Sequence, residues 1–157
     1  MRILLLVLLM CTAIFAKNME FKGLSYDDLN ISSTQLCPVK QTTLPKNRDF
    51  IGVVVYKDGS YDVMSSPKYT FKQIHHIQKT KEKEVVKSYV MDYKTKKLID
   101  TQTAYYVFGS TLMSVGGDDI IPFEKQQDAQ AFKKEYKGKK IYTIERMTER
   151  FIDYLEM

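Results

Sequence analysis

The sequence predicts an α+β fold, with two successive strand–strand–helix–strand units forming one domain. We expect a largely antiparallel sheet with the helices on one face. Two observations support this. Residues 50–56 and 104–108 are apolar runs rich in β-branched and aromatic residues, which is typical of buried strands. Each run is later followed by a pattern that repeats at helical spacing and then by another extended segment.

The first unit opens with the strand at residues 50–56. Asp58 and Gly59 follow directly and form a strong two-residue hairpin signal. Residues 60–64 alternate between polar and apolar side chains and are expected to pair back onto the first strand.

A helix is expected to follow this hairpin. Ser66 is a favourable N-cap and Pro67 suits the first helical position. Its apolar stripe consists of Phe71, Ile74 and Ile77. Residues 82–93 then read as a long strand, with one face formed by Val85, Tyr89, Met91 and Tyr93.

The second unit repeats this order. Its expected segments are a short strand at 97–101, a buried strand at 104–108, a loop at 109–117, an extended segment at 120–123, a helix at 124–136, a strand at 139–144 and a short terminal helix at 145–155. The main helix should turn Ala129, Phe132 and Tyr136 inward, and Gly138 lies just past its end.

Residues 1–16 have the pattern of a secretory signal peptide. Arg2 gives a positive start, residues 3–10 form an apolar run too short to span a bilayer, and Ala16 offers a small residue before a cut. The expected division is therefore a signal peptide at 1–16, a leader at 17–36 and the domain at 37–157, with a periplasmic mature protein. Lipidation at Cys11 is an alternative, although Met10 stands where a lipidation site favours a small residue.

Composition excludes several classes of function. The chain has 157 residues, 44% hydrophobic and 27% charged, which is ordinary for a globular domain. Its net charge of +5 comes almost entirely from Lys, whereas specific nucleic-acid readers favour Arg. No apolar stretch after the signal is long enough to span a membrane. We therefore expect neither nucleic-acid binding nor a transmembrane span.

The sequence also lacks the usual signatures of an enzyme. It has no glycine-rich phosphate loop, nucleophile elbow or His-Glu-x-x-His pair, so no catalytic residue is expected. Asp118 and Asp119 are expected to be solvated acids in a turn. His75 and His76 are adjacent on a helix and diverge by roughly 100°, which disfavours a shared metal ion.

The remaining candidates for chemistry are two sulfur-containing residues. Cys37 is the only cysteine after the predicted signal, so the mature chain has no intrachain disulfide. Met113 stands on the loop at 109–117, where its thioether is presented rather than packed. A thiolate and a thioether together suit Cu(I), and the sequence alone does not show whether they meet. His75 is a third candidate ligand.

The order of these segments resembles the NosL family, exported accessory proteins of nitrous oxide reductase, over roughly residues 36–145. Three stretches carry the likeness. Residues 90–100 resemble V-x-D-Y-x-T-G-K-x-I-D, residues 104–110 resemble A-x-Y-V-x-G-S, and residues 122–132 resemble P-F-x(5)-A-x-A-F. The resemblance implies a Cu(I)-binding or delivery module that assists a periplasmic copper enzyme or its assembly machinery.

The chain departs from the metal motifs that the resemblance implies. Of the family's C-x-x-C-G-M, the first cysteine is Cys37, but the second falls at Lys40 and the methionine at Thr42. The methionine of the family's P-M-G loop falls at Gly116, with Met113 three residues earlier. Two functions stay open: a relocated Cu(I) site formed by Cys37 and Met113, or a metal-free periplasmic interaction module that docks through its sheet face or Lys-rich edge.

Overall fold

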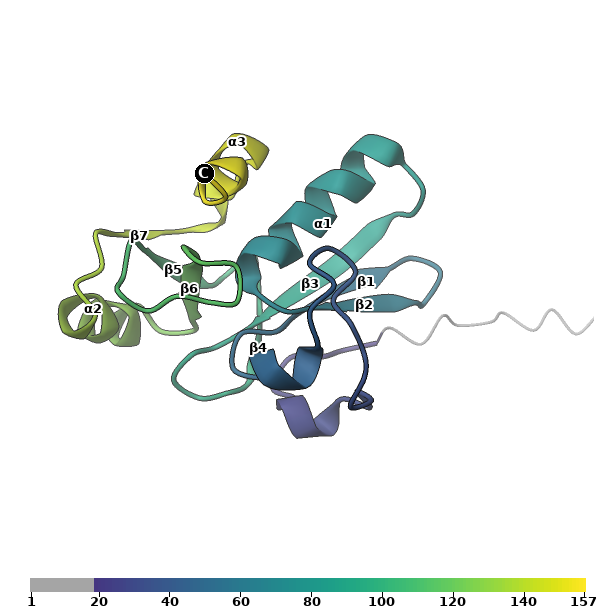
Figure 1. Cartoon of the computed structure of the whole chain (residues 1–157), viewed down its shortest axis with the longest axis horizontal. Coiled ribbons are helices and arrows are strands. Elements are labelled where there is room, and N and C mark those ends of the chain that lie inside the picture. The colour runs from purple at the N-terminus through teal and green to yellow at the C-terminus, as the bar shows by residue number, and fades with distance from the viewer. Residues whose placement is uncertain (1–18) are drawn as a thin grey trace, which may run out of the picture.

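Strands and helices alternate along the chain in two similar units, seen in the computed structural model, which describes residues 19–157 (Figure 1). Within that range the order is β1-β2-α1-β3-β4 followed by β5-β6-α2-β7 and α3. The predicted signal peptide and Cys11 lie outside the described residues. The α+β class and the repeated strand–strand–helix–strand order are confirmed.

The first unit builds a four-stranded antiparallel sheet in the order β2-β1-β3-β4. Its strands are β1 (Gly52–Tyr56), β2 (Tyr61–Met64), β3 (Val85–Met91) and β4 (Leu98–Asp100). The hairpin at Asp58 and Gly59 joins β1 to β2, as predicted. Helix α1 (Pro67–Thr80) lies across one face of this sheet, and the Ser66 hydroxyl caps it by accepting a hydrogen bond from the Tyr69 N–H.

The second unit builds a separate three-stranded antiparallel sheet in the order β6-β5-β7. Its strands are β5 (Tyr105–Phe108), β6 (Ile120–Phe123) and β7 (Lys140–Tyr142). Helix α2 (Gln126–Glu135) covers one face. The single sheet expected from the sequence is therefore two. The segment at 97–101 pairs with β3 and completes the first sheet, and the extended segment at 120–123 is the actual hairpin partner of β5.

A cluster of buried apolar side chains, here called the apolar layer, joins the two sheets. Phe71 of α1 and Tyr106 of β5 meet there edge to face, with ring centroids 5.6 Å apart. The short terminal helix α3 (Glu149–Tyr154) closes this layer with Phe151 and Ile152, after a 3-10 turn at Ile144–Arg146. Each of the two main helices therefore covers its own sheet (Figure 1), and α3 packs with α1 and the second sheet through Phe151 and Ile152.

The segment predicted to be a leader packs against the domain from residue 19 onward. Phe21 and Leu29 are buried on the face of the first sheet opposite α1, in the same apolar cluster as Leu44. The N–H of Gly23 donates to the carbonyl of Leu98 on β4, and the Leu98 N–H donates back to Leu24. Residues of the segment at 17–36 therefore belong to the packed core of the first sheet, because α1 covers only the other face of this sheet.

Contrary to the sequence prediction, Val85 does not lie on the same face of β3 as Tyr89 and Met91. Along β3, Tyr89 and Met91 point toward the N-terminal segment, whereas Val85 packs with Ile77 of α1. The pairing shifts between Val55 and Tyr56, so an extra residue of β3 is inserted there. Such a bulge reverses the side-chain alternation beyond it.

No helix within residues 19–157 is long and apolar enough to cross a bilayer.

Candidate metal centre

Cys37 begins a tight turn that lies against the first sheet. Its N–H donates to the Thr42 carbonyl at 2.9 Å, and the Gln41 N–H donates to the Cys37 carbonyl at 2.8 Å. Leu36 and Thr43 pair across the open end of the turn. The Cys37 side chain has no exposed surface, so the expected thiol is enclosed in the apolar cluster beneath residues 19–47 rather than presented at the surface.

The closest polar partner of this thiol is a methionine that the sequence did not single out. Cys37 Sγ donates to the Sδ of Met64 across 3.9 Å, and Met64 is also completely buried. Met64 is the last residue of β2 and pairs with Gly52 of β1, which turns its side chain into the core. Its strand position indicated only an inward side chain, so no sequence signal linked it to Cys37.

Met113 lies on the loop between β5 and β6, as predicted, and its side chain is 58% exposed. It is not among the residues that make up the cluster around Cys37. The structure therefore places the two candidate sulfurs in different surroundings, one enclosed and one at the surface.

The loop that carries Met113 nevertheless packs onto the cluster around Cys37 through Tyr69. A Cβ added at Gly116 would lie 2.5 Å from the Tyr69 hydroxyl oxygen and 3.0 Å from Lys68 Cε. Both distances are shorter than an ordinary contact, so a side chain at position 116 would displace the Tyr69 hydroxyl or the Lys68 side chain. Gly116 stands where the resemblance implies a ligating methionine, and a methionine there would require this packing to shift.

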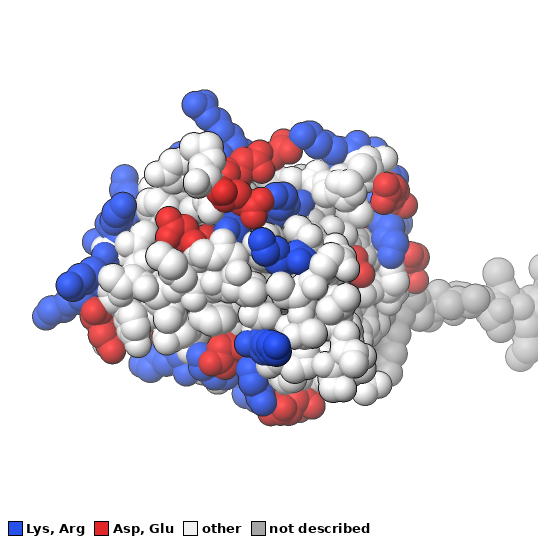
Figure 2. Space-filling view, in the orientation of Figure 1, with Lys and Arg blue, Asp and Glu red and all other residues white. Residues whose placement is uncertain are grey.

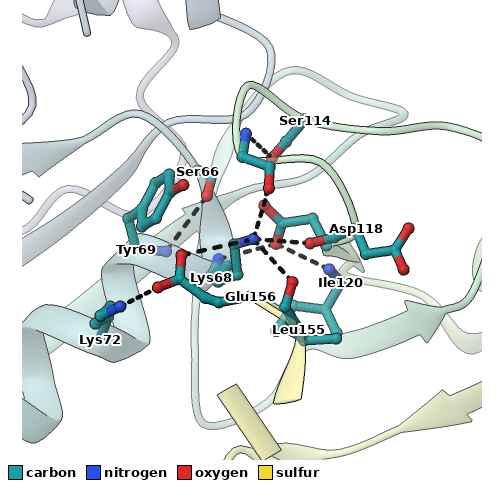
Figure 3. A network of polar contacts seen from close by, with 11 residues as sticks. Ser66, Lys68, Tyr69, Lys72, Ser114, Asp118, Ile120, Leu155 and Glu156 are labelled. Atoms are coloured by element: carbon teal, nitrogen blue, oxygen red, sulfur yellow. Dashed lines mark hydrogen bonds and ion pairs between the residues drawn. The ribbon is translucent and has the colours of Figure 1, made fainter. Parts of the chain in front are cut away.

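A buried ammonium group fastens the same loop to α1 and to the end of the chain (Figure 3). Lys68 is fully buried, and its Nζ donates to three carbonyl oxygens: Gly116 at 2.8 Å, Asp118 at 3.1 Å and Leu155 at 3.1 Å. The Glu156 carboxylate lies 3.8 Å from this nitrogen and also pairs with Lys72. The network joins three segments that are far apart in the sequence.

Asp119 belongs to this network and is not the solvated acid expected from the sequence. It is 3% exposed and accepts hydrogen bonds from the backbone N–H of Lys68 at 2.9 Å and from the Ser114 hydroxyl at 2.5 Å. Burial raises the pKa of the Asp119 carboxyl, against the opposing effect of its hydrogen bonds. Asp118 is exposed, so the two neighbouring carboxyls diverge as predicted.

Three buried hydroxyls in this region have no hydrogen-bond partner among the described residues: Thr42 Oγ1, Ser65 Oγ and Tyr69 Oη. Thr42 ends the turn that Cys37 begins, Ser65 follows Met64, and Tyr69 belongs to the same apolar cluster. Burial raises the pKa of Tyr69 to about 12, with smaller contributions from Glu156, Asp119 and Cys37. Tyr69 therefore stays neutral at physiological pH beside the thiol.

His75 lies away from the sulfur pair. It is half-buried on α1, and its Nε2 lies 2.9 Å from the Met147 carbonyl oxygen. Adjacent His76 is exposed, so the two rings diverge as expected. Within residues 19–157 no group of three or more His, Cys, Asp or Glu side chains could hold a metal ion. A site for a hard or borderline metal is therefore not apparent in this range.

Charged side chains are mixed over the surface. Figure 2 shows Lys and Arg interspersed with Asp and Glu, without one continuous basic patch on this face. Exposed lysines pair with acids, as in Lys57–Glu84 at 2.7 Å and Lys79–Glu149 at 2.6 Å.

Both the sequence and the fold of this chain are similar to those of known proteins. A family model described as NosL matches residues 28–152. Among solved structures, the chain is similar to the crystal structure of the copper chaperone NosL from Shewanella denitrificans. That match has a TM-score of 0.62 and 21% sequence identity, and it covers 78% of this chain and 96% of that one. No curated protein matches the chain.

Proposed function

Since the chain belongs to the NosL family, we propose that it is an exported accessory protein that binds Cu(I) and delivers it to a periplasmic copper enzyme, such as nitrous oxide reductase, or to its assembly machinery. The observation that carries the proposal is the Cys37 thiol, which lies against a thioether in an apolar core. Soft sulfur ligands favour Cu(I), and one thiol without several histidines makes a poor tetrahedral zinc site. In this role the protein carries the ion as cargo and catalyses no reaction.

Met113 is the proposed surface contact for this cargo. Its exposed thioether stands on the loop that packs on Tyr69, which in turn lies in the cluster around Cys37. An exposed soft ligand near an enclosed thiol suits ligand exchange with a partner, because the ion remains bound to sulfur as it passes.

Export is part of the proposal. The signal-peptide pattern of residues 1–16 supports a periplasmic protein that begins near Lys17. Lipidation at Cys11 would instead anchor the chain to a membrane, and the intact mass of the exported protein distinguishes the two.

The test of copper binding is an anaerobic competition titration against a colorimetric Cu(I) chelator. The reduced protein should take up at most one Cu(I) per chain. Cys37→Ser should abolish binding because it removes the thiolate, and Met113→Leu should weaken it without changing the fold. All variants should carry Cys11→Ala, so that Cys37 is the only thiol. A wild type that fails to compete for Cu(I) would contradict this function.

The departures from the family's metal motifs favour a second candidate. Gly116 stands at the family position for a loop ligand, where a side chain would displace Tyr69 or Lys68, and Lys40 and Thr42 replace two further motif ligands. The chain would then be a metal-free interaction module on the same scaffold, docking on an exported partner through its sheet face or Lys-rich edge. Failure of copper binding in the titration would leave this candidate in place.

A further inference from the structure

We propose that Met64 is the internal partner of Cys37, and that the two sulfurs form an enclosed two-ligand holding site for Cu(I). This inference rests on the proposed function and names the site in which the ion is kept. Cys37 would supply the thiolate from the turn at residues 37–42, and Met64 the thioether from the end of β2.

The separation of the two sulfurs suits one bound ion. Their distance is 3.9 Å. Metal–sulfur bonds of about 2.3 Å bridge sulfur atoms up to about 4.6 Å apart, so a single ion can bind both in a bent arrangement. Binding replaces the Cys37 S–H···S hydrogen bond with two sulfur–metal bonds. The thiol proton leaves to solvent and the oxidation state of copper does not change.

The surroundings of the pair favour a soft monovalent ion. The neighbouring cluster is apolar, and it includes Leu44, Val53 and Tyr89. A thiolate and Cu(I) together carry no net charge, so the complex can be buried at far lower cost than a divalent ion with the same two ligands. The apolar setting also keeps competing water away from the sulfurs. Both effects distinguish this pair from an exposed thiol, which would exchange metal readily but hold it weakly.

The turn above the pair offers a way for the ion to reach it. Residues 37–42 close through two backbone hydrogen bonds, and Gln41 within them has a left-handed φ of 59°. The turn covers the thiol, because the Cys37 side chain at its start has no exposed surface. Opening this short turn would therefore expose Cys37 and Met64 together without unfolding the sheet.

Met91 provides a matched control for Met64. It is another buried methionine in the same apolar cluster, on β3, so Met91→Leu makes the same chemical change at a comparable depth. Leucine conserves the volume of methionine closely, so both variants should fold. Thermal unfolding of each apoprotein checks this before any copper is added.

The experiment measures Cu(I) affinity by anaerobic chelator competition and sulfur coordination by X-ray absorption, in the Cys11→Ala background. Met64→Leu should lower the affinity at least tenfold and reduce the sulfur ligands from two to one. Met91→Leu should bind like the wild type, and Met113→Leu should lose less affinity than Met64→Leu.

Two outcomes overturn the inference in different ways. If Met64→Leu matches Met91→Leu in affinity and coordination while Cys37→Ser abolishes binding, copper delivery stands and Met64 is merely a core residue. If the wild type binds no Cu(I), the proposed function fails and the holding site falls with it.

Discussion

Lys68 shows how one residue organises the region around the candidate site. Its ammonium group is enclosed by carbonyl oxygens from the β5–β6 loop and from the end of α3. A buried charge is tolerated only when its hydrogen bonds are satisfied, and here three carbonyls and the Glu156 carboxylate do so. No sequence signal singled out Lys68, because a helix position next to Pro67 carries no sign of burial.

Replacing Lys68 tests this role. Lys68→Met should lower the free energy of unfolding by about 3–5 kcal/mol, since it leaves buried carbonyls and a carboxylate without their partner. Lys72→Met is the control, because Lys72 pairs with the same Glu156 but is partly exposed, and should cost about 1 kcal/mol or less. Urea unfolding measures both. Equal small losses would show that the Lys68 network does not stabilise the fold.

The candidate site was predictable from single residues only in part. Cys37 stands out because it is the one thiol after the signal pattern. Met64 does not, because its link to Cys37 arises from tertiary packing between residues 27 positions apart. Met113 was correctly placed on a loop, but a loop position says nothing about which core residues lie beneath it.

At the scale of elements, local sequence signals predicted the cap and the turn well, but they predicted the ends of the elements less accurately. The cap at Ser66 and the turn at Asp58 and Gly59 are local chemistry and were predicted directly. The end of α2 differs in detail. Lys137, not Gly138, takes the left-handed conformation, with a φ of 54°. Gly138 is instead needed for close packing, since a Cβ there would lie 2.6 Å from Val107 Cγ1.

The apolar stripe of α2 gives a prediction at this scale. Phe132 is 5% exposed, stacks on Tyr136 at 4.3 Å and packs against Phe123 at 5.1 Å between ring centroids. Phe132→Ala should therefore cost about 3–5 kcal/mol in unfolding free energy. Exposed Lys134→Ala on the same helix should stay within about 0.5 kcal/mol. Denaturant titration with both variants decides whether α2 is a packed element of the core.

At the scale of the whole molecule, the elements were predictable but their pairing was not. Two sheets form because β4 is held by β3 and β5 by β6, and such choices depend on contacts between distant segments. The N-terminal segment was missed for a related reason. Its apolar residues, such as Phe21 and Leu29, are too sparse to show a period, yet they pack on one face of the first sheet in the same cluster as Cys37.

The attachment of this segment should depend on pH through Glu20. Its carboxylate accepts hydrogen bonds from Lys87 at 2.6 Å and from the Tyr89 hydroxyl at 2.8 Å, both on β3. The bonds from Lys87 and Tyr89 lower the pKa of Glu20 from 4.5 to about 2. A carboxyl whose pKa is lowered by folding stabilises the folded state above its unfolded pKa, and this contribution is lost as the pH falls from about 4.5 toward 2. Because Glu20 is largely exposed, solvent screening limits the effect to about 1 kcal/mol.

Glu20→Gln should therefore be less stable than the wild type at pH 7, and the difference should shrink on acidification. Urea unfolding of the pair at pH 7, 5, 4 and 3 measures it. A difference that stays constant over this range would show that Glu20 does not fasten the N-terminal segment to β3.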